Sequence, residues 1–260
     1  MKNPHETPQN RHSEVVQQAL EGVTKKCMGR YTYLEQLREG TLSLREFAFS
    51  IKVRLEAASS FIPFLTKTEQ RMRSEGQWQD MADVLKSNLH DELGIVEEKE
   101  DISKAHLTWR NNFRSGIQRV LDLKGISWEE INAKKSIQYV DSFYGGALKE
   151  FAEEDTIPAL AGGFAVLEGI LEQEFLSIHN YIRSNLSEML PRERLYIEHH
   201  AGHEHKHYKE CQDSLLRKCI SSPHIVPEVI YGINKMQHIR MYHMHDQGVV
   251  VGLLKDEFKK

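Results

Sequence analysis

Apolar residues recur at helical spacing along almost the whole chain. Between residues 42 and 72 they fall at Leu44, Phe47, Ile51, Leu55 and Ala58, the i, i+3, i+4 progression of a helix with one buried face. The same spacing predicts further helices over residues 76–93, 101–121, 135–152, 155–185, 191–219 and 227–250. No stretch combines strand alternation with a hairpin turn. We therefore expect an all-α fold of roughly seven helices, with Pro63 kinking or dividing the first of them.

The organisation of the chain follows from its length and its first residues. A chain of 260 residues is long enough to bury a sizeable core in one domain. Residues 1–12 hold two prolines among polar side chains, which predicts a disordered tail. Residues 13–260 are then expected to form a single helical domain.

Composition narrows the class of protein. The formal net charge of −4 does not favour a polyanion, so we expect no nucleic-acid partner. Cys27, Cys211 and Cys219 are an odd set without paired spacing, as is typical of free thiols in a reducing compartment. The chain has neither the apolar centre of a signal peptide near its start nor a run of about 20 apolar residues, so we expect a cytoplasmic protein that is not in a membrane.

Residues 196–211, YIEHHAGHEHKHYKEC, are the most unusual stretch. On a helix, positions i, i+4 and i+7 fall within a narrow arc, and here they are His200, Glu204 and His207. Tyr196 and Leu215 lie near the same arc, so it should face the core. Ionisable groups there are costly unless they are paired or bound to a metal. The alternative is a solvated face whose histidines are only surface charge.

A second register is the zinc-protease motif, because HEHKH at residues 203–207 satisfies H-E-x-x-H. His203 and His207 would then bind zinc, Glu204 would be the general base and Glu228 a third ligand. That class of protease presents its substrate to an edge strand, and the sequence predicts no strand.

Two other helices carry acidic groups on apolar stripes. In the helix predicted over residues 155–185, Glu168 shares the inner stripe with Phe164 and Phe175, and Glu172 is the alternate. The Gly162-Gly163 pair permits close helix contact or a bend. The helix over residues 76–93 ends in NLHDELG, which supplies Asp91 and Glu92, and His106 follows at the start of the next helix.

Three of these motifs, taken in order over residues 88–207, resemble the heme-oxygenase-like diiron oxidases and oxygenases, including the CADD-like branch: NLHDELG followed by His106, GGFAVLEG, and H-x3-[DE]-x2-H at HAGHEHKH. The resemblance implies a heme-oxygenase-like helical bundle. It also implies six ligands of two irons, which are Glu92, His106, Glu168, His200, Glu204 and His207. The interval from Glu92 to His106 is wider than is usual in that family, and Glu204 stands where Asp is more usual. A ferritin-like site would need a second E-x-x-H motif besides the one at Glu204 and His207.

Three carboxylates and three imidazoles suit iron, with manganese as the alternative metal. We expect a dioxygen-dependent oxidoreductase whose partners are dioxygen and a small substrate of amino-acid or fatty-acid type, with a homodimer left open. The alternatives are a metal-independent thiaminase-like or cofactor-biosynthesis enzyme of the same fold, and a helical interaction protein. Residues expected around the site are the apolar Phe164, Leu167, Leu171 and Phe175, the ligand-supporting Asp91, Tyr196 and His203, and the pocket tyrosines Tyr139, Tyr144 and Tyr196.

Overall fold

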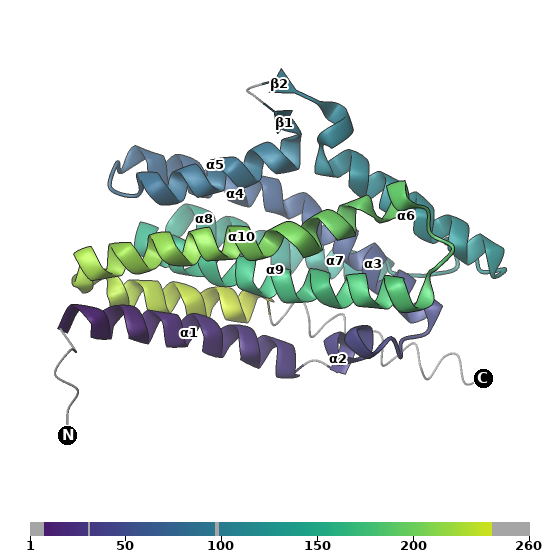
Figure 1. Cartoon of the computed structure of the whole chain (residues 1–260), viewed down its shortest axis with the longest axis horizontal. Helices are drawn as coiled ribbons and strands as arrows, with labels where there is room; N and C mark the ends of the chain where they lie inside the picture. Colours follow the sequence, from purple (N-terminus) through teal and green to yellow (C-terminus); the bar gives the residue numbers. More distant parts are fainter. Residues whose placement is uncertain (1–7, 31, 97–98, 241–260) are drawn as a thin grey trace.

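The computed structural model of the protein describes residues 8–30, 32–96 and 99–240, and nearly all of them are helical (Figure 1). The helices are α1 (Pro8–Arg30), α2 (Thr32–Glu39), α3 (Leu44–Ala57), α4 (Phe61–Ser74), α5 (Gln79–Leu93), α6 (His106–Leu123), α7 (Lys134–Tyr139), α8 (Gly146–Glu154), α9 (Ile157–Asn185) and α10 (Pro191–Ser221). A last helical segment covers residues 226–240. The all-α prediction is therefore confirmed.

The helices are more numerous than the expected seven for local reasons. A 3-10 turn at Ala58–Ser60 divides the predicted helix over residues 42–72, and Pro63 lies in the first turn of α4, where its missing N–H costs nothing. A π-helical turn at Val140–Gly145 separates α7 from α8. Helix α1 begins at Pro8, so residues 8–12 are helical and not a disordered tail, because proline suits a first helical turn. Residues 1–7 and 241–260 lie outside the described residues.

Helix α9 is the centre of the bundle. Every residue from Ala159 to Ile170 is buried, as expected of a helix that other helices enclose. Helix α10 runs along α9, and it also packs against α1, α5 and α6 (Figure 1). The two long helices with the strongest sequence signals therefore lie side by side in the core.

The segment 226–240 approaches α9 through glycines. A Cβ atom on Gly232 would overlap the carbonyl group of Ala159, and one on Gly162 would overlap that of Val229. Gly162 therefore allows a close helix contact, one of the two roles expected of the Gly162-Gly163 pair.

This contact gives a prediction about stability. The Gly232→Ala substitution is expected to lower the free energy of unfolding by about 1–3 kcal/mol, because rigid backbone must move to admit the methyl group. The control is Gly22→Ala on α1, where nothing lies within 4 Å of the new Cβ, and alanine should stabilise this helix by up to about 1 kcal/mol. Urea unfolding measures both, and equal effects of the two substitutions would contradict the close contact.

A short hairpin joins α5 to α6, and the sequence analysis missed it. Strands β1 (Ile95–Val96) and β2 (Lys99–Glu100) pair antiparallel, with Ile95 opposite Glu100 and Val96 opposite Lys99. Two residues per strand are too few to produce a recognisable alternation. The hairpin projects from the bundle at the top of Figure 1.

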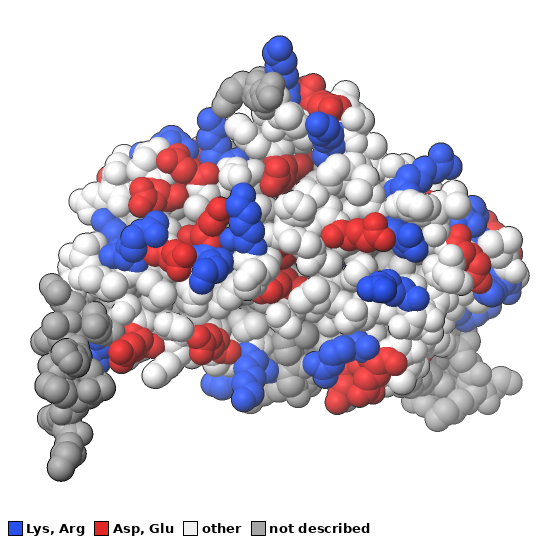
Figure 2. Space-filling model, viewed as in Figure 1, with Lys and Arg blue, Asp and Glu red and all other residues white. Residues whose placement is uncertain are grey.

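The surface of the described part carries mixed charge. On the face shown in Figure 2, Lys and Arg side chains are interspersed with Asp and Glu side chains, and neither sign gathers into one patch. No helix in the described part of the chain has the length and apolar character needed to cross a membrane. The ionisable groups of greatest interest lie inside the bundle.

Candidate metal centre

Helix α10 turns one face of its histidine-rich stretch inward. His200 and Glu204 are buried, and the imidazole of His200 hydrogen-bonds through Nδ1 to Oε1 of Glu204 at 2.5 Å. His207 follows on the same face, with 12 % of its side chain exposed. His205 points outward, with 71 % of its side chain exposed. The predicted inner arc of His200, Glu204 and His207 is therefore the arc that faces the core.

Helix α9 supplies Glu168, whose side chain lies in the fully buried part of that helix. Both carboxylate oxygens are buried and have no hydrogen-bond partner among the described residues. Burial raises the pKa of Glu168, and the negative charge of Glu204 raises it further. The alternate, Glu172, lies at the edge of the bundle, where Oε1 is 3.0 Å from Nδ1 of the exposed His205. Of the two glutamates, only Glu168 reaches the interior site.

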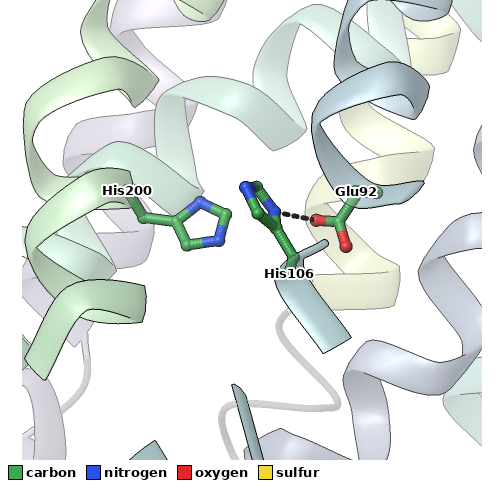
Figure 3. A group of neighbouring side chains, drawn as sticks. All are labelled: Glu92, His106 and His200. Carbon is green, nitrogen blue, oxygen red and sulfur yellow. Dashed lines mark ion pairs between the residues drawn. The ribbon is translucent and has the colours of Figure 1, made fainter. Parts of the chain in front are cut away.

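Glu92 and His106 lie close together because the hairpin brings the chain back to the end of α5. Gly94 ends α5 with φ of +71°, and a Cβ there would overlap the backbone of Asp101 and Ala105. The N–H of Asp101 donates to the carbonyl oxygen of Gly94 at 2.7 Å, which closes the loop. Nδ1 of His106 then lies 3.1 Å from Oε1 of Glu92 (Figure 3). The wide interval between the two residues is thus occupied by a hairpin and does not separate their side chains.

All six residues named in the sequence analysis come together, in two groups. Glu92, His106 and His200 form the first, and Glu168, Glu204 and His207 form the second. Within each group, one possible ligand atom per residue lies within 4.8 Å of the others. All six residues line one small cavity. Figure 3 shows the first group, with the rings of His106 and His200 next to each other in an edge-to-face arrangement and Glu92 beside His106.

The polar atoms of this cavity fit a bound cation at each group. Nε2 of both His106 and His200 is buried without a hydrogen-bond partner in the described chain, as are the oxygens of Glu168. Buried polar groups that lack partners are rare and costly, typically about 1–3 kcal/mol each. Two divalent ions would use these free donor atoms and would offset the three carboxylate charges. The two groups could therefore hold metal ions.

Neighbouring side chains position some of these donors. Oδ2 of Asp91 lies 3.4 Å from Nε2 of His207 and raises the pKa of that imidazole against the opposing effect of burial. The ring of Tyr196 meets the ring of His200 edge-on, with centroids 4.6 Å apart. His203 does not support a ligand as expected. Its ring is exposed and stacks on His199 at 4.1 Å, because its position on α10 faces away from the core.

The zinc-protease register is not supported by this arrangement. His203 and Glu228 are both exposed, and neither belongs to the two groups formed by the described residues. Two of the three zinc ligands required by that register therefore lie outside the cavity.

A pocket adjoins the cavity. Glu92, His200 and Glu204 line both, so the pocket opens onto the candidate ligands. Phe175 and Leu171 are in its wall, as expected, and Phe175 stacks on His200 with centroids 4.1 Å apart and planes 7° apart.

The other expected pocket residues divide into two sets. Tyr144 and Tyr196 line the pocket. Phe164 and Leu167 instead lie in the fully buried part of α9 and belong to the core. The side chain of Tyr139 lies outside what the structure describes.

The sequence analysis missed several residues here. Asn88 lines the cavity one helical turn before Glu92, and that spacing was a usable signal. Arg54 and Arg240 line the pocket. Arg54 follows Ile51 by three residues on the core-facing stripe of α3, so it too was an ionisable group on an apolar face.

Comparisons with known proteins support the fold. No protein-family model matches the sequence, and no curated protein matches it. Among solved structures, the chain is similar to a CADD-like protein of unknown function from Nostoc punctiforme, with a TM-score of 0.65 and 11 % sequence identity over 92 % of this chain and 99 % of that one. The chain therefore shares the helical fold of a CADD-like protein, and the resemblance seen in the sequence is confirmed at the level of the fold.

Proposed function

We propose that the protein is a non-heme diiron oxidase or oxygenase that uses dioxygen to oxidise a small substrate of amino-acid or fatty-acid type. The observation that carries this proposal is the pair of buried Glu and His groups that share one cavity. Glu92, His106 and His200 would hold one iron, and Glu168, Glu204 and His207 the other. The hard and intermediate donors suit Fe(II) or Mn(II) better than a structural zinc site, which favours thiolates.

Bound iron would supply the electrons that reduce dioxygen. The side chains around it would connect and position the ligands and exclude water. Glu204 hydrogen-bonds to His200 and so connects the two groups. Asp91 holds the imidazole of His207. Phe61 and Phe175 keep water away from the ligands and offer an apolar surface to the substrate. The three cysteines are buried free thiols, which suits a reducing compartment such as the cytoplasm.

The proposal is tested by oxygen uptake. Protein loaded anaerobically with Fe(II) should consume dioxygen in an amount that rises with iron and levels off at about two irons per chain, since there are two ligand groups. The control is Glu204→Ala, which removes the ligand that connects the groups and should abolish the uptake. Saturation at one tightly held ion, or uptake that is unchanged in Glu204→Ala, would contradict the proposal.

A further inference from the structure

A second buried ionic cluster lies beside the candidate metal centre. It consists of Arg54 from α3, Glu174 from α9 and Arg240 from the segment 226–240. Nη1 of Arg54 pairs with Oε1 of Glu174, and Nη2 of Arg240 lies 2.6 Å from Oε2. The Glu174 side chain is fully buried, and those of Arg54 and Arg240 are 9 % and 3 % exposed. Two guanidinium groups therefore share one carboxylate inside the protein.

Both arginines face the pocket that opens onto the candidate ligands. The guanidinium group of Arg54 lies 4.3 Å from the centroid of Phe175, and Phe175 in turn stacks on His200. Arg240 donates from Nη1 to the hydroxyl of Tyr144 at 3.0 Å, while its Nε is buried without a hydrogen-bond partner in the described chain. One aromatic ring thus separates the cluster from a candidate ligand.

The charges of the described residues in this pocket do not balance. Arginine stays protonated in proteins, so two positive charges against Glu174 leave one in excess. Glu92 and Glu204 also line the pocket, but in the proposed function they are ligands of the metal ions. Three ligand carboxylates against two divalent ions leave a further positive charge at the centre. Among the described residues that line the pocket, positive charge is therefore in excess, and a bound anion would offset it.

We propose that Arg54 and Arg240 form an anion-binding subsite, and that the substrate is a small monocarboxylate with an apolar body. The carboxylate would contact the guanidinium groups, which suit it because they offer planar paired donors. The carbon chain would lie along Phe61, Leu171 and Phe175 toward the metal ligands. The choice of substrate rests on the proposed function, but the subsite itself rests on the cluster.

The same pocket disfavours a free amino acid. An α-ammonium group needs an acceptor, and Glu174 is already paired with both arginines. The remaining carboxylates in the pocket wall, Glu92 and Glu204, belong to the candidate metal ligands. Within the two substrate classes of the proposed function, the fatty-acid type therefore fits and the zwitterionic amino-acid type does not.

The experiment compares octanoate, octanamide and 2-aminooctanoate by calorimetric titration of the full chain, both metal-free and loaded with Mn(II). Octanoate should bind at least about tenfold more tightly than the other two, as hydrogen bonds to a charged group imply. This comparison uses the unaltered protein, so its result does not depend on whether a variant folds. Equal binding of octanoate and octanamide would overturn the subsite.

Variants locate the anion. Arg54→Gln should remove most of the preference for octanoate, while Arg45→Gln should retain it, since Arg45 is a half-buried arginine on the same helix that pairs with Glu130. If the preference survives in Arg54→Gln but is lost in His200→Ala, the carboxylate binds at the metal ions and the proposal is wrong.

The two proposals fail in different ways. Preference for octanoate in a protein that takes up no pair of irons would remove the diiron function and leave the subsite. Two irons bound without any preference would remove the subsite and leave the function.

Discussion

Replacing His200 with alanine is expected to remove at least one iron ion from the loaded protein and to abolish its iron-dependent oxygen uptake. His200 belongs to the first group, and its Nδ1 hydrogen-bonds to Glu204 of the second, so its loss disturbs both. The fall in metal affinity should exceed the roughly 10–100-fold that losing a supporting neighbour of a ligand costs. Iron content after gel filtration, with circular dichroism to verify the fold, measures the effect.

His203→Ala is the matched control on the same helix. His203 is exposed and stacks on His199, outside the two groups. Its loss should leave both irons bound. If His203→Ala empties the site while His200→Ala leaves it filled, the assignment of His200 as a ligand is wrong. The zinc-protease interpretation, in which His203 is a ligand, would then be favoured.

The second large effect is expected at Glu168, where function and stability should oppose each other. Glu168→Met should eliminate the second metal group. It should also stabilise the metal-free protein by about 1–3 kcal/mol, because it replaces a buried carboxyl group without hydrogen-bond partners by an apolar side chain of similar size. Thermal unfolding with and without Fe(II) measures both effects, and iron should raise the melting temperature of the unaltered protein but not that of Glu168→Met.

Glu172→Met is the control for this substitution, one turn further along α9. Glu172 pairs with the exposed His205 at the surface, and such pairs contribute about 0–1 kcal/mol. This variant should keep the rise in melting temperature with iron. A Glu168→Met protein that is less stable without metal and still stabilised by iron would show that Glu168 has only a structural role.

The parts of the molecule that the sequence predicted are those in which a single helix carries the signal. The inner arc of α10 and the placement of Glu168 on α9 follow from a period of 3.6 residues, because the register of a helix fixes which side chains share a face. Helix boundaries near Pro63 and Pro191 follow from the missing N–H of proline.

The features that the sequence did not predict depend on contacts between distant segments. Arg240 meets Glu174 across 66 positions of the chain, and neither residue signals the other locally. The hairpin after Glu92 is too short to alternate, and only its closure through Gly94 explains how His106 returns to Glu92. Residues 1–7, 31, 97–98 and 241–260 lie outside this comparison.

The most direct test of the account is an anomalous difference map, measured at the iron absorption edge, from crystals of the full chain loaded anaerobically with Fe(II). The account predicts two peaks in the shared cavity, one in contact with Glu92, His106 and His200, and the other in contact with Glu168, Glu204 and His207. A single peak between His203 and His207, or crystals of the loaded protein without a peak in this cavity, would contradict it.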